Sequence, residues 1–155
     1  MKLEILQENL NQAVSIISRL VSTRAQLPVL SNILLKAENN QLKLSATNLE
    51  TGMNLWVNAK VSQPGAVTIP ARVLTELVAS LPPEAVTLES QGDKLTVTGG
   101  KYKASVNGIA AEEFPAVPSL TKGAEGLRLD KNMLICRGKA TARKRRSPFK
   151  SITFT

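Results

Sequence analysis

The sequence contains no histidine and only one cysteine among its 155 residues. A serine or cysteine nucleophile usually needs a neighbouring base, most often histidine, so the common nucleophilic hydrolases are excluded. Cys136 has no partner for an intrachain disulfide, and without histidine or a second cysteine it cannot anchor a zinc site of ordinary spacing. We therefore expect no metal and no cofactor, and a reducing, cytoplasmic setting.

Aromatic residues and long apolar runs are also scarce. Aromatics make up 3% of the chain, and Trp56 and Tyr102 both fall in strand patterns, which favours structural roles over stacking on single-stranded bases. No apolar run approaches the ~20 residues that span a bilayer, and no export signal opens the chain. We expect a protein that is neither exported nor membrane-spanning.

Two short motifs that could indicate catalysis are better explained otherwise. Gly99-Gly100 precedes a predicted strand and lacks the following Lys-Ser/Thr of a phosphate-binding loop. Glu112-Glu113 is predicted to be a solvated loop, because adjacent carboxylates in a loop usually point apart. The sequence offers no catalytic residue, so an enzyme ranks behind a binding protein, and a metal-dependent nuclease assay would test that class.

Positive charge is abundant but unevenly distributed. The chain has 20 basic and 12 acidic residues, a net charge of +8. Residues 1–121 hold ten of each sign, whereas residues 122–155 hold ten basic and two acidic residues. The whole excess lies in the C-terminal segment, so it says nothing about the partner of the preceding 121 residues.

The hydrophobic periodicity predicts the same order of elements twice. Each half reads as strand, helix and three strands. Asn9 is predicted to cap the first helix with Gln12 as its partner, and Pro70 to open the second. The first half comprises strands over 1–6, 33–37, 42–46 and 53–61 around a helix with the apolar stripe Leu10, Ala13, Val14, Ile17, Leu20 and Val21. The second comprises strands over 66–69, 86–88, 95–97 and 102–106 around a helix with the stripe Leu74, Leu77, Val78 and Leu81.

This duplication predicts an α+β fold in which two strand-helix-three-strand units pair about a pseudo-two-fold axis. The two helices should lie side by side on one surface, packed on mainly antiparallel sheets. Arg19 on the first helix, Arg24 just beyond it and Arg72 at the opening of the second would then share that surface. Guanidinium groups among small polar side chains suit sequence-independent contacts with phosphate oxygens of duplex DNA. The alternative is that they are ordinary solvated arginines.

Several motifs, in order, resemble a known family. They are the opening Met1-Lys2-Leu3, Arg24 followed by Leu27-Pro28-Val29-Leu30-Ser31-Asn32-Ile33-Leu34-Leu35, then Ala46-Thr47-Asn48-Leu49-Glu50, Thr68-Ile69-Pro70-Ala71-Arg72, and Glu113-Phe114-Pro115. Over residues 1–120 the chain resembles the N-terminal domain of the bacterial sliding clamp, the beta subunit of DNA polymerase III. The resemblance implies a DNA clamp fold and a non-catalytic processivity factor.

In that family, three such domains per chain and two chains head to tail form a ring around duplex DNA, with helices lining the hole. The resemblance therefore implies DNA-facing roles for Arg24 and Arg72, with Arg19 on the same helix, and a ring interface at the strand through Ala104 and Val106. The implied partners are duplex DNA, the polymerase III core, the clamp loader and a second copy of the chain.

The C-terminal part departs from the family. Residues 121–134 resemble a linker and the start of a second clamp domain, and the resemblance ends there. Residues 135–155 form a basic tail without an apolar stripe, which we interpret as truncated or frame-shifted sequence. The family's pocket for the polymerase and clamp loader requires later domains that these residues cannot build. The alternative is a small basic nucleic-acid-binding protein that acts through its tail.

Overall fold

The computed structural model describes residues 1–21, 27–115, 117 and 149–154. The first half contains β1 (Lys2–Leu6), α1 (Gln7–Ile17), the 3₁₀ turn η1 (Pro28–Ser31), β2 (Asn32–Glu38), β3 (Gln41–Thr47), β4 (Gly52–Asn58) and β5 (Lys60–Gln63). The second contains β6 (Gly65–Pro70), α2 (Ala71–Ser80), β7 (Ala85–Gln91), β8 (Lys94–Gly99), β9 (Tyr102–Asn107) and the 3₁₀ turn η2 (Ala111–Glu113). A further strand, β10, spans Phe149–Phe154.

The strands form two five-stranded antiparallel sheets in which the two halves exchange their first strands. One sheet has the order β5-β1-β7-β8-β9, and the other has the order β10-β4-β3-β2-β6. β1 of the first half therefore pairs with β7 of the second, while β6 of the second pairs with β2 of the first. This exchange makes the two predicted units one folded body, because neither unit completes a sheet alone.

The segments that follow β4 and β9 extend the same symmetry. After β4 the chain crosses to the first strand of its own half, where β5 pairs with β1. After β9 it crosses likewise, and Ile109 forms a bridge with Thr68 of β6. At each crossing an amide donates to the turn of an earlier hairpin, Ala59 N to Asn40 O at 3.1 Å and Gly108 N to Asp93 O at 2.7 Å.

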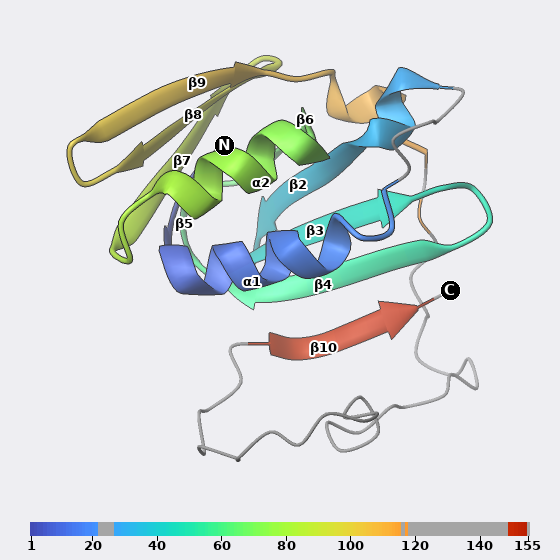
Figure 1. Ribbon diagram of the computed structural model, residues 1–155, viewed down its shortest axis with the longest axis horizontal. Coiled ribbons are helices and arrows are strands. Elements are labelled where there is room, and N and C mark those ends of the chain that lie inside the picture. Colours follow the sequence, from blue (N-terminus) through green and yellow to red (C-terminus); the bar gives the residue numbers. More distant parts are fainter. Residues whose placement is uncertain (22–26, 116, 118–148, 155) are drawn as a thin grey trace.

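The two helices pack against each other and cover one side of the sheets (Figure 1). On α1 the buried residues Leu10, Ala13, Val14 and Ile17 recur at helical spacing, and on α2 the buried residues are Ala71, Leu74 and Val78. These faces join the inward-facing residues of both sheets in one apolar cluster. The predicted α+β arrangement, with two helices side by side on antiparallel sheets, is confirmed.

Three details of the sequence-based prediction were wrong. α1 begins at Gln7 rather than after Asn9, and its N-cap residue Leu6 makes no side-chain hydrogen bond. The reason is a tertiary contact. The backbone amide of Gln7, at the start of the helix, donates to Glu84 O at 2.9 Å, so this amide needs no capping side chain. α1 also ends at Ile17, and residues 18–20 form a turn, so Leu20 and Val21 pack against the core from beyond the helix.

The third error concerns the predicted strand over 53–61. It divides at Ala59, because the chain there leaves the sheet of β3 and β4 and joins the sheet of β1 as β5. An alternating apolar pattern does not record that change of sheet. Within the described ranges, no helix is long and apolar enough to cross a membrane.

Candidate functional site

The candidate site is the outward side of α1 and α2, which lie next to each other in Figure 1. The arginines predicted from the sequence to contact DNA were assigned to this side. Most of the outward positions of the two helices are small or polar. The described charged residues of this helical surface are Glu8, Arg19, Arg72 and Glu76, all exposed. We refer to it below as the helical face.

Arg72 lies in the first turn of α2 and is paired with a carboxylate. Its Nε is 3.0 Å from Oε1 of Glu76, four residues later, and the Arg72 side chain is 86% exposed. An exposed ion pair at this spacing contributes only about 0.3–0.5 kcal/mol. A pair this weak and this exposed does little to fix the position of the guanidinium.

The position of Arg72 is electrostatically unfavourable for the helix itself. The amino-terminal end of a helix carries partial positive charge, so the first turn favours acidic side chains by about 0.3–1 kcal/mol. At the equivalent position of α1, the second residue of the helix, the chain has Glu8. The charge of the helix end therefore does not favour an arginine at position 72.

Beside Arg72 the helical face is hollowed. A hollow of about 480 Å³ lies where α1 ends and α2 begins, bordered mainly by apolar surface. Its described lining residues are Ser18, Val21, Ser31, Pro70, Ala71, Arg72, Thr75 and Glu76. Arg72 is thus at the rim of a concave region rather than on an isolated ridge.

Of the other two predicted arginines, the structure describes Arg19 but not Arg24. Arg19 is exposed but lies in the turn after α1 rather than on the helix, which corrects the sequence-based placement. Its amide donates to Ile16 O at 3.3 Å, and its neighbour Ser18 lines the same hollow as Arg72. Arg24 lies outside the described residues.

The predicted ring-interface residues Ala104 and Val106 lie on β9, an edge strand. Both are half-buried and alternate with the exposed Lys103, Ser105 and Asn107. β9 pairs with β8 through all six of its residues, so its other side faces no strand among the described residues.

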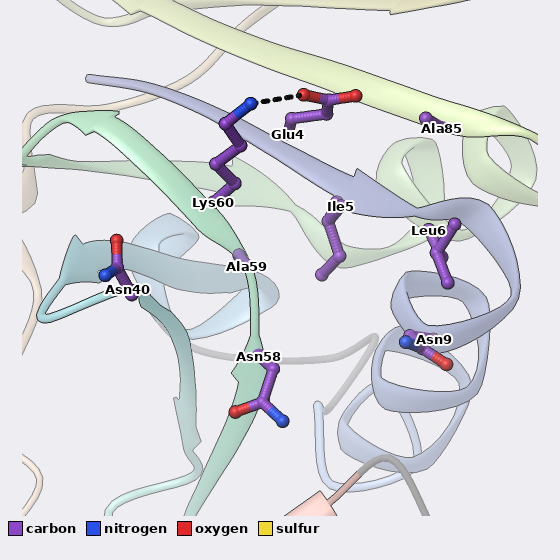
Figure 2. A pocket seen from close by; sticks show the side chains of 9 residues that line it. All are labelled: Glu4, Ile5, Leu6, Asn9, Asn40, Asn58, Ala59, Lys60 and Ala85. Atoms are coloured by element: carbon purple, nitrogen blue, oxygen red, sulfur yellow. Dashed lines mark ion pairs between the residues drawn. The ribbon is translucent and has the colours of Figure 1, made fainter.

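A second hollow, of about 650 Å³, lies where β4 gives way to β5, near the start of α1 (Figure 2). It is lined by Glu4, Ile5, Leu6, Asn9, Asn40, Asn58, Ala59, Lys60 and Ala85. Oε2 of Glu4 is 3.9 Å from Nζ of Lys60 and both side chains are exposed by half or more, so the two form a surface ion pair. No other ionisable side chain is among these described lining residues.

Other sequence-based assignments can also be placed. Glu112 and Glu113 are exposed in η2, as expected for a solvated loop. Trp56 lies in β4 with Lys43 Nζ 5.4 Å from its ring centroid, and the exposed Tyr102 begins β9. Within the described ranges, no group of three histidine, cysteine, aspartate or glutamate residues converges to hold a metal.

The Arg72–Glu76 pair and the hollow beside it were not predicted from the sequence. The pair could have been found, because opposite charges four residues apart on a helix are neighbours. The hollow could not, because residues from the segment after α1, from η1, from the end of β6 and from α2 line it together.

Two exchanged strand-helix-three-strand units, with paired helices on one side and antiparallel sheets on the other, define a DNA-clamp domain. The sequence model of the family described as DNA polymerase III beta subunit, N-terminal domain, matches residues 1–118. The chain belongs to this family.

Related sequences and solved structures agree with this family assignment. The beta sliding clamp of Synechococcus elongatus is 38% identical over 138 residues, which cover 87% of this chain and 36% of the relative. That of Vibrio cholerae is 34% identical over 76% of this chain. The structure of Caulobacter crescentus pol III beta superposes with a TM-score of 0.72 at 35% identity, covering 77% of this chain and 33% of that one. The chain therefore spans about a third of the length of these relatives.

Proposed function

We propose that this chain is the N-terminal part of a bacterial DNA sliding clamp, a non-catalytic, cytoplasmic processivity factor of DNA polymerase III. The observation that carries the proposal is the helical face, where an arginine at the start of α2 stands where helix physics favours an acid. The chain belongs to the clamp family, so the anionic partner that we propose for this arginine is duplex DNA.

The physical mechanism follows from weak contacts. Arg72 and Arg19, together with Arg24, would each contact backbone phosphates without reading base edges. Residues 1–121 carry equal numbers of basic and acidic residues, so these contacts would be few and easily exchanged. A ring that is held topologically can slide on such contacts, whereas a strongly basic ring would bind through many released counterions and slide poorly.

Ring formation would use the free edge of β9. In the proposed assembly the strand through Ala104 and Val106 meets a later domain of a second chain, and that later domain is not part of these 155 residues. The polymerase III core and clamp loader would bind the complete ring. A single domain of this kind would contact DNA transiently, because closure around the duplex would need the whole ring.

Duplex binding by the whole chain tests the role of the helical face. In fluorescence anisotropy at low salt, replacing both Arg19 and Arg72 by alanine should weaken binding. It should also reduce the slope of log affinity against log salt by about 0.9 for each lost phosphate contact. The matched control replaces Lys36 and Lys43 by alanine, because both lie on the face of β2 and β3 away from the helices. An equal loss in the control would contradict the proposal.

One observation favours a second candidate, a small nucleic-acid-binding protein that acts through its tail. The entire net charge of +8 comes from residues 122–155. Replacing Arg143, Lys144, Arg145 and Arg146 by glutamine would then remove most duplex binding and its salt dependence, while the arginine substitutions on the helical face would do little. Selective retention of the chain on circular rather than linear DNA would instead show that it can close around DNA by itself.

A further inference from the structure

The two sheets have four edges, and the way each edge is protected differs. The edges are β5 and β9 in one sheet and β6 and β10 in the other. An edge strand presents unpaired amides and carbonyls that can pair with another chain, so proteins protect edges by shortness, lysine, proline, irregular register or a covering segment.

Three of the edges carry such protection. β5 has only four residues and begins with Lys60, whose side chain is 82% exposed. β6 ends with Pro70 and is met by Ile109, which exchanges hydrogen bonds of 3.3 and 3.1 Å with Thr68. β9 carries the exposed Lys103 and directly follows the exposed Lys101.

β4 has no comparable protection of its own. Its sequence, Gly-Met-Asn-Leu-Trp-Val-Asn, contains no charge and no proline, and it pairs with β3 in unbroken register over seven residues. Its side chains are buried on both faces, since Leu55 and Asn54 are each 0% exposed. This is the sequence of an interior strand, and it would be the most association-prone edge of the molecule if left open.

β10 occupies that edge and has the features of an outer strand. It pairs antiparallel with β4 from Val57 to Met53, and the two lie side by side in Figure 1. The register of this pairing is irregular between Phe149 and Ile152. An irregular register in an outer strand limits further strand addition.

We propose that β10 is a covering strand that keeps the β4 edge closed, and that an uncovered β4 pairs with β4 of a second copy of this chain. Antiparallel pairing of the same strand about a two-fold axis is self-complementary, and the uncharged β4 opposes no like charges in such a pair. This inference concerns the C-terminal strand and does not rest on the proposed DNA contacts.

The test breaks the pairing of β10 in the full chain. Ile152→Pro removes an amide and is incompatible with a regular ladder opposite Leu55. Thr155→Pro, which follows the strand, is the matched control. In sedimentation velocity, the parent chain and the control should remain monomeric, and Ile152→Pro should form dimers and larger species as its concentration rises. A monomeric Ile152→Pro chain with an intact circular-dichroism spectrum would overturn the proposal.

Two further measurements apply if Ile152→Pro associates by unfolding instead. A peptide of residues 148–155 added in trans should return the variant to a monomer, whereas a scrambled peptide should not. Hydrogen exchange of dilute protein should show faster exchange in β4 but not in β8. Failure of the peptide together with faster exchange in both strands would show general unfolding and overturn the covering role.

Discussion

The two helices occupy equivalent positions in the two units but differ at their first residues. When the helices are aligned at their starts, Leu10 matches Leu74 and Val14 matches Val78, and all four side chains are 0% exposed. The faces that build the core are therefore repeated. The sequence pattern is duplicated at these positions because each helix packs the same face against the core.

The junctions between the helices are not repeated. Where α1 begins and α2 ends, the buried Gln7 side chain donates from Nε2 to Val78 O at 2.7 Å. Where α2 begins and α1 ends, the equivalent residue is Ala71, and the hollow beside Arg72 takes the place of such a bridge. The first junction thus stabilises the fold, and the second leaves a concave, mainly apolar surface bordered by Arg72 and Glu76.

The largest expected effect on stability tests whether the two helices contribute equally to the shared core. Leu10→Ala and Leu74→Ala should each lower the free energy of unfolding by roughly 2–5 kcal/mol, because each leaves a cavity in one shared core. Urea denaturation monitored by circular dichroism measures both. A loss in one variant less than half that in the other would show that the two units do not share the core equally.

The second effect concerns the crossings at Ala59 and Gly108. A Cβ added at Gly108 would collide with the backbone oxygen of Thr68, so Gly108→Ala should cost about 1–3 kcal/mol or more and loosen the Ile109 bridge. The control is Ala59→Gly at the equivalent crossing, which should cost only about 0.5–1 kcal/mol. Thermal unfolding compares the two, and equal losses would refute the role of the close approach.

The third effect tests the closed junction. Gln7→Ala should cost about 0.5–1.5 kcal/mol, because the Val78 carbonyl loses the hydrogen bond from Gln7 Nε2 and keeps only the longer one, of 3.4 Å, from the Leu81 backbone amide. Gln12→Ala replaces an exposed glutamine on the same helix and should change stability by less than about 0.5 kcal/mol. If the two variants have the same urea midpoint, the Gln7 bridge is not what stabilises this junction.

The smallest expected effect is on the free energy of unfolding when the charged second residue of each helix is neutralised. That charge is favourable in α1 and unfavourable in α2. Glu8→Gln should destabilise the chain by about 0.3–1 kcal/mol through loss of a favourable charge at the start of α1. Arg72→Gln should leave stability within about 0.5 kcal/mol, because relief of the unfavourable charge offsets loss of the Glu76 pair. A clear destabilisation by Arg72→Gln would mean that Arg72 is retained for the fold.

Much of the fold could be predicted, and the reasons are local. Alternation along residues 42–46 and 95–97 and the stripe of Leu74 and Val78 require only neighbouring residues to be read. The start of α1, the change of sheet at Ala59 and the strand β10 were not predicted, because each depends on a contact with a distant segment. Of the candidate site, Arg72 was predicted at its correct place, Arg19 was assigned to the wrong element, and the hollow was not foreseen.

The sequence by itself determined the duplicated order of elements, the pairing of helices with antiparallel strands, and the neutrality of residues 1–121 against a basic C-terminal segment. These follow from side-chain periodicity and charge, which are properties of neighbouring residues. Only the tertiary structure decided that the units exchange their first strands, that one helix junction is closed while the other is hollow, and that β10 covers β4. Each of these depends on which distant backbone groups and side chains meet, and no local pattern records that.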